Sequence, residues 1–264
     1  MITPRKALYE LPASFYLGVG GPIAYSRHLG CDSILFSRRL LSPEKVAAAQ
    51  AAGLHAWVYA SPPSWGAATW RTTVMAMREA KRTYPSLLGY IADPEGPDTD
   101  PDASWAGDTA AEAEALADAL EVDARAGGSI GFTSFPYWKH RAVIARRAPS
   151  VWGSPQLYGI RETPRPSIAT ILGWAAPWKT LFPGPRYVPS LAAWGRTGEN
   201  FRAYLDAMRV QPAGLFWQNG SPPAGADDAA LAAWQPGARP GSGGGILGVL
   251  AALGLGYAAW KVLR

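Results

Sequence analysis

The chain has 264 residues, of which 48% are hydrophobic and 17% charged, and its net charge is +5. This composition provides enough apolar side chains for one large core and excludes a mostly disordered chain. The single cysteine, Cys31, excludes an internal disulfide bond and a metal site made of several cysteines. Basic residues gather only in pairs, such as Arg38-Arg39, so we expect no nucleic-acid partner.

The N-terminal segment 1–13 contains prolines and charges and lacks the apolar stretch of a secretory signal, so we expect no cleavable signal peptide. After it, short apolar runs alternate with helical patterns, which is typical of strand–helix units around a parallel sheet. We therefore predict an α/β protein with the (β/α)8 TIM-barrel fold, which takes about 250 residues. An open doubly wound sheet is the alternative.

Eight strands are predicted, at 15–19, 33–36, 54–60, 87–92, 130–135, 151–160, 187–192 and 215–218. Ser42 is expected to cap a helix that has Pro43 at its first position and ends at Gly53. Further helices are predicted at 69–83, 109–126, 167–174 and 199–209.

The composition changes after Gln235, so we predict a barrel domain at 1–235, a Gly/Pro-rich linker at 236–245 and a C-terminal helix at 246–264. As a helix, the last segment is about 27 Å long, close to the thickness of a bilayer core. Tyr257 and Trp260 near its end are typical of a membrane interface.

We therefore expect a single transmembrane helix that anchors the protein to membrane lipid. Gly248, Ala252 and Gly256 form a stripe of small residues, which is typical of self-association between such helices. The alternative is an Ala/Gly-rich helix that docks on the barrel.

Two carboxylates follow the strand at 87–92. Asp93 and Glu95 are two residues apart, so a strand directs both to one face, at the barrel end where enzymes of this fold carry out their chemistry. Glu95 reaches further into a cleft and is the better acid for cleaving a glycosidic bond. Because both carboxylates lie on one side of the substrate, they favour a retaining, substrate-assisted reaction in which Asp93 orients the sugar's acetamido group. A solvated loop with two acids is the alternative.

These carboxylates, the Gln-x-Tyr sequence at 156–158 and Trp217 on the last strand resemble the chitinase-like glycoside hydrolases of family 18 and, more loosely, the family 25 lysozymes. The resemblance covers residues 14–235. It implies catalytic roles for Glu95 as proton donor, Asp93 as its partner and Tyr158 as a donor to the acetamido group. The predicted substrate-binding residues are Gln156, Trp217, Asn219 and Tyr90.

The chain also departs from these families. Ser61-Pro62-Pro63 stands where the chitinases have Ser-x-Gly-Gly, and the predicted first strand lacks the aspartate of the family 25 lysozymes. The alternative function is a noncatalytic glycan-binding or structural virion protein. His28, His55 and His140 are isolated, so we expect no metal and no cofactor.

The expected substrate is an N-acetylated polysaccharide such as peptidoglycan or chitin. Degradation of a cell wall without a signal peptide is consistent with a bacteriophage protein that enters a membrane after synthesis. We expect such a protein in a virion membrane or at host lysis.

Overall fold

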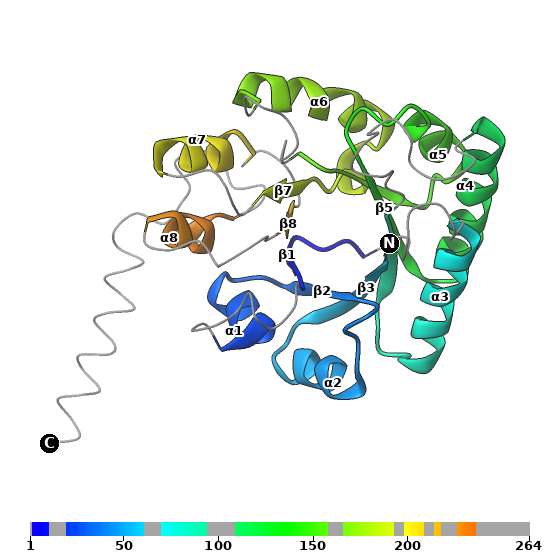
Figure 1. Ribbon diagram of the computed structural model, residues 1–264, viewed down its shortest axis with the longest axis horizontal. Helices are drawn as coiled ribbons and strands as arrows, with labels where there is room; N and C mark the ends of the chain where they lie inside the picture. Colours follow the sequence, from blue (N-terminus) through cyan, green and yellow to red (C-terminus); the bar gives the residue numbers. More distant parts are fainter. Residues whose placement is uncertain are drawn as a thin grey trace, which may run out of the picture.

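A computed structural model describes residues 2–10, 20–60, 70–93, 109–157, 166–192, 198–208, 214–217 and 226–235. Within these ranges eight strands form one sheet, in which the paired neighbours run parallel (Figure 1). The strands are β1 (Lys6–Tyr9), β2 (Ser33–Ser37), β3 (His55–Ala60), β4 (Gly89–Ala92), β5 (Ser129–Ser134), β6 (Trp152–Pro155), β7 (Ser190–Ala192) and β8 (Gly214–Trp217).

The sheet closes on itself. Its order is β6-β5-β4-β3-β2-β1-β8-β7, and parallel bridges join Gly153 to Tyr187 and Gln156 to Ser190. These bridges connect β6, at one end of the order, with β7 and the residues that lead into it. Eight parallel strands closed in this way have the architecture predicted for a (β/α)8 barrel.

The helices of the described residues surround the sheet (Figure 1). Ser42, Thr109 and Ser167 each cap a helix by accepting a hydrogen bond from the backbone N–H three residues further on, so the predicted cap at Ser42 is confirmed. The helices are α1 (Gly21–His28), α2 (Pro43–Ala51), α3 (Trp70–Thr83), α4 (Ala110–Arg125), α5 (Arg141–Arg147), α6 (Ile168–Leu181), α7 (Gly198–Met208) and α8 (Ala226–Ala233), with a 3-10 turn, η2, at Gly184–Arg186.

Two layers of buried side chains stabilise the barrel. The outer layer lies between the sheet and the helices. The inner layer fills the barrel, where the rings of Trp57 and Trp152 meet edge to face with centroids 5.9 Å apart. Its members alternate along the strands with those of the outer layer, as the pleat of a strand requires. They are Ala7, Tyr9, Leu35, Trp57, Tyr59, Ile91, Trp152 and Val188.

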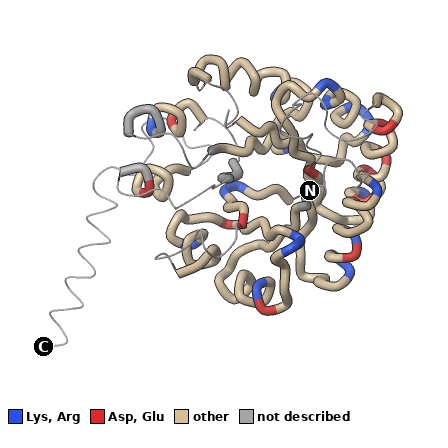
Figure 2. The backbone as a smooth tube through the Cα atoms, viewed as in Figure 1, with Lys and Arg blue, Asp and Glu red and all other residues tan. Residues whose placement is uncertain are grey.

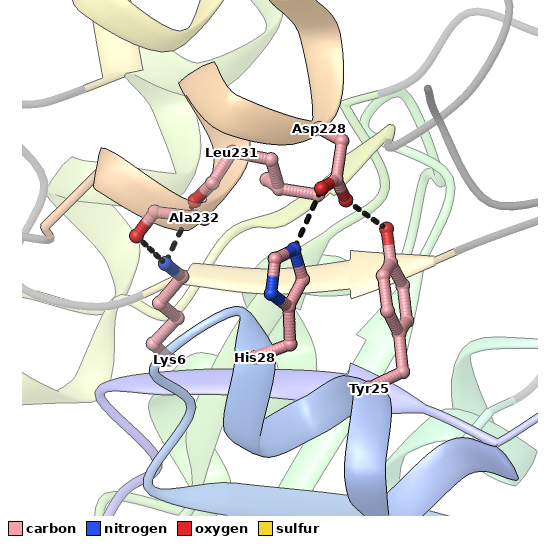
Figure 3. Close-up of polar contacts among 6 residues, drawn as sticks. All are labelled: Lys6, Tyr25, His28, Asp228, Leu231 and Ala232. Carbon is pink, nitrogen blue, oxygen red and sulfur yellow. Dashed lines mark hydrogen bonds and ion pairs between the residues drawn. The ribbon is translucent and has the colours of Figure 1, made fainter. Parts of the chain in front are cut away.

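The first strand differs from the prediction. β1 is Lys6–Tyr9, whereas the predicted segment, 15–19, lies outside the described residues. Residues 6–9 were not predicted as a strand because the N-terminal segment contains prolines and charges, including Lys6. The side chain of Lys6 is nevertheless only 2% exposed. Its ammonium donates hydrogen bonds of 2.8 Å to the carbonyl oxygens of Leu231 and Trp234, at the end of α8 and just after it (Figure 3 draws the bond to Leu231). Main-chain acceptors therefore allow this charge to be buried in a strand.

The linker at 236–245 and the predicted membrane helix at 246–264 lie outside the described residues. Within the described ranges, no helix combines the length and apolar character needed to cross a bilayer.

Candidate active site

Asp93 directly follows β4 at the carboxyl end of the barrel. Its side chain is 5% exposed, and its Oδ1 accepts a hydrogen bond of 3.1 Å from Nε2 of Gln156. Gln156 directly follows β6 and is 3% exposed. Because β5 separates β4 from β6 in the sheet, this bond crosses the barrel interior rather than linking adjacent strands. Most charged residues lie on the outer helices (Figure 2), so a buried carboxylate here is an exception.

A chain of hydroxyl groups lies in the same interior. The Tyr9 hydroxyl is 3.3 Å from Oγ of Ser190, which is 2.7 Å from Oγ of Ser154. Thr133 on β5 donates to the carbonyl oxygen of Ser154 at 2.8 Å. Burial and the neighbouring charge of Asp93 raise the pKa of Tyr9 well above its usual value, so this hydroxyl stays protonated and able to donate.

A second buried carboxylate, Glu10, follows β1 at the same end of the barrel. It is 1% exposed, and Oε1 is 2.6 Å from Nζ of Lys45 on α2. Burial raises the pKa of Glu10, and the hydrogen bond from Lys45 partly offsets that effect. The Tyr59 hydroxyl donates to the Glu10 carbonyl oxygen at 2.9 Å, and the Tyr59 ring packs edge-on against Tyr9. These contacts tie the end of β1 to α2 and β3.

The structure brings two of the predicted site residues together, Asp93 and Gln156, and separates a third from them. Tyr90 lies in the outer layer and donates a short hydrogen bond to Asp123 on α4. Tyr90 and Asp93 are three positions apart, an odd number, so the pleat directs the two side chains to opposite faces of β4. The predicted substrate contact of Tyr90 is therefore corrected to a structural contact between the sheet and α4.

The remaining predicted residues are not placed. Glu95, Tyr158 and Asn219 lie outside the described residues. Trp217 ends β8, where it pairs with Ala192 of β7, but its side chain is not described. Within the described ranges, no three His, Cys, Asp or Glu side chains are grouped so that they could hold a metal ion.

The interior hydroxyl groups were not predicted from the sequence; they belong to Tyr9, Thr133, Ser154 and Ser190. Their signal was present in part: Ser154 is two residues before Gln156, so both face the interior of one strand. Tyr9 was missed because the first strand was placed too late in the chain. Single hydroxyl residues in short strands do not stand out until the register of the sheet is known.

No family model and no curated protein matches the chain. Solved structures do match its fold. An endo-beta-1,4-glucanase from Xanthomonas axonopodis pv. citri is 10% identical with a TM-score of 0.57, over 88% of this chain and 99% of that one. A GH5_18 protein from Streptomyces cattleya, solved with Manb1-4GlcNAc, is 18% identical with a TM-score of 0.52, over 81% and 70% of the two chains.

A beta-glucuronidase from Bacteroides uniformis is 11% identical with a TM-score of 0.56, over 82% of this chain. The chain spans only 30% of that protein's length. At these identities the likeness shows the fold alone, a (β/α)8 barrel, and this fold carries many unrelated activities.

Proposed function

We propose that the barrel is a glycoside hydrolase whose reaction centre lies at the carboxyl end of β4. The observation that carries this proposal is the buried Asp93 carboxylate, held by Gln156 at the barrel end where enzymes of this fold bind substrate. Solved barrels of similar fold include an endo-beta-1,4-glucanase and a beta-glucuronidase, which supports this class of reaction.

The proposed substrate is an N-acetylated polysaccharide such as peptidoglycan or chitin. Glu95 donates a proton to the glycosidic oxygen while the bond from that oxygen to the anomeric carbon breaks. The acetamido oxygen of the same sugar forms a bond to the anomeric carbon, and Asp93 orients the acetamido group. Water then attacks the anomeric carbon while the bond from the acetamido oxygen to that carbon breaks. The water loses a proton to Glu95, which restores the acid, and the two displacements together retain the anomeric configuration. Tyr158 and Trp217 complete the proposed sugar site.

We also propose that the segment 246–264 anchors the barrel to a membrane and that the protein acts in a bacteriophage virion or at host lysis. The support for the anchor is the uncharged sequence between Gly241 and Trp260. The stripe of Gly248, Ala252 and Gly256 supports self-association of that helix.

The experiment measures release of reducing ends from purified peptidoglycan and from chitin oligomers. We expect the wild-type protein to cleave one of them and Glu95→Gln to lower kcat by about 10²–10⁴-fold, the usual contribution of a general acid. Glu79→Gln is the matched control, because Glu79 lies on α3 with half of its side chain exposed and pairs with Arg82. No cleavage by the wild-type protein, with glycan binding retained, would instead support a noncatalytic attachment protein.

A further inference from the structure

The backbone of Gln156 is fixed in the barrel wall by contacts with two neighbouring strands. Its backbone N–H donates to the Ser134 carbonyl oxygen at 3.0 Å, and a parallel bridge joins it to Ser190. The next residue, Leu157, donates to the Ser190 carbonyl oxygen at 2.9 Å. Gln156 is thus held from both sides, by the end of β5 and by β7, at the point where the barrel closes.

The side chain of Gln156 points from this fixed position toward Asp93. Both side chains are at least nine-tenths buried, and Nε2 of Gln156 is 3.1 Å from Oδ1 of Asp93. A buried side chain held at its backbone loses few rotamers when it makes this bond, so the bond fixes the carboxylate at little entropic cost.

The chemistry of an amide suits this position. An amide N–H donates to a carboxylate without adding a charge and without titrating. It stabilises the ionised carboxylate relative to the acid, because a carboxylate accepts hydrogen bonds more strongly. Tyr9 is a titratable neighbour from β1 in the described interior; burial and the charge of Asp93 raise its pKa, so it stays protonated.

We propose that Gln156 is a positioning residue, whose side-chain amide holds the Asp93 carboxylate across the barrel in the orientation that the reaction centre requires. This inference rests on the proposed function and changes the predicted role of Gln156, from contacting substrate to acting through Asp93. The competing role is purely structural, in which Gln156 only helps β6 meet β7.

The test compares Gln156→Leu and Gln156→Glu with the wild-type protein. Leucine removes the donor, so we expect kcat to fall about 10- to 100-fold at every pH, with KM within about threefold, because a misplaced catalytic group slows the chemical step. Glutamate donates only when it is protonated. Its activity should therefore be retained at acid pH and fall as the pH rises, which a purely structural role would not produce.

A second readout does not need activity. The side-chain carboxyl of Asp93 is followed by carbon-13 NMR during a pH titration, and its signal is identified by its loss in Asp93→Asn. We expect its midpoint to move to higher pH in Gln156→Leu, because the ionised form loses a hydrogen bond. Gln50→Glu on the exposed face of α2 is the control and should leave the midpoint unchanged.

The outcomes separate the two proposals. If the midpoint moves but the wild-type protein cleaves no glycan, the proposed function fails and the positioning contact stands. An unchanged midpoint in Gln156→Leu, together with the same pH profile in Gln156→Glu and the wild-type protein, would overturn the positioning role. If Gln156→Leu does not fold, the pH profile of Gln156→Glu decides alone.

Discussion

Lys6 shows how one buried residue can hold two ends of the chain together. Besides its bonds to Leu231 and Trp234, its ammonium donates to the carbonyl oxygen of Ala232 at 3.3 Å (Figure 3). Beside it, α1 contacts α8 through Asp228, whose carboxylate oxygens lie 3.1 Å from the Tyr25 hydroxyl and 2.6 Å from Nε2 of His28. The first strand, the first helix and the last described helix therefore share one set of polar contacts.

The substitution Lys6→Met tests the role of this ammonium. It removes a donor that three main-chain acceptors near the end of α8 share, and we expect a loss of about 1–3 kcal/mol in the free energy of unfolding at pH 7. Burial lowers the pKa of Lys6 to about 8. Between pH 8 and the ordinary pKa of a lysine, the unfolded chain binds more protons than the folded protein, so stability rises with pH.

The free energy of unfolding should therefore differ more between the wild-type protein and Lys6→Met at pH 10 than at pH 7. We expect this difference to grow by roughly 2 kcal/mol in favour of the wild-type protein. Burial raises the pKa of Cys31 to about 12, which acts in the opposite direction, but both proteins contain Cys31 and its effect largely cancels in the difference. Urea unfolding of both proteins at pH 7 and pH 10 measures these free energies. The same difference between the two proteins at both pH values would contradict a buried Lys6 ammonium.

At the scale of elements, the sequence predicts the middle of the barrel well. The strands β2 to β5 overlap the predicted segments at 33–36, 54–60, 87–92 and 130–135, because continuous apolar runs followed by strong helix signals are typical of buried parallel strands. The helices α1, α5 and α8 were not predicted. Each has only seven or eight residues, too few for a clear helical period.

The inner layer gives a sharp test of element packing. A methyl group at Gly131 on β5 would lie 2.3 Å from the Trp152 ring inside the barrel. We expect Gly131→Ala to lower the free energy of unfolding by about 1–3 kcal/mol, as overpacking does. Gly173→Ala is the matched control, because this α6 residue has no atom within 4 Å of the added methyl group.

Alanine at Gly173 should be neutral or stabilise the protein by up to about 1 kcal/mol through its higher helix propensity. Urea unfolding of both variants gives the comparison. Similar free energies of unfolding for the two would mean that the Trp152 ring does not fill the barrel beside Gly131.

At the scale of the whole molecule, the sequence predicts the closed barrel but only part of the candidate site. Asp93 could be placed at a strand end and Gln156 within the sixth predicted strand, 151–160, whereas their contact depends on which strands face each other across the interior. Tyr90 was predicted to contact substrate, whereas it lies in the outer layer and contacts Asp123 on α4. The buried positions of Lys6 and Glu10 depend on partners far along the chain, Leu231 and Lys45, which no local pattern reveals.

The C-terminal segment gives a prediction for the whole chain. A chain ending at Gln235 keeps the bond from the Trp234 indole to the Leu205 carbonyl oxygen, 2.8 Å long, and should fold with an unchanged melting temperature. We expect the full chain to sediment with phosphatidylcholine vesicles and the shortened chain to remain in the supernatant, because 246–264 supplies the apolar surface. Loss of folding in the shortened chain would show instead that the segment belongs to the barrel.

We propose that the carboxyl end of β4 cleaves glycosidic bonds, and proton NMR of N-acetylated chitin oligomers during hydrolysis is the decisive experiment. We expect the first product to keep the anomeric configuration of the substrate, and we expect Glu95→Gln and Asp93→Asn to slow its formation by about 10²–10⁴-fold, while Glu79→Gln does not. A first product of inverted configuration, or hydrolysis at the wild-type rate in Glu95→Gln and Asp93→Asn, would rule out this mechanism.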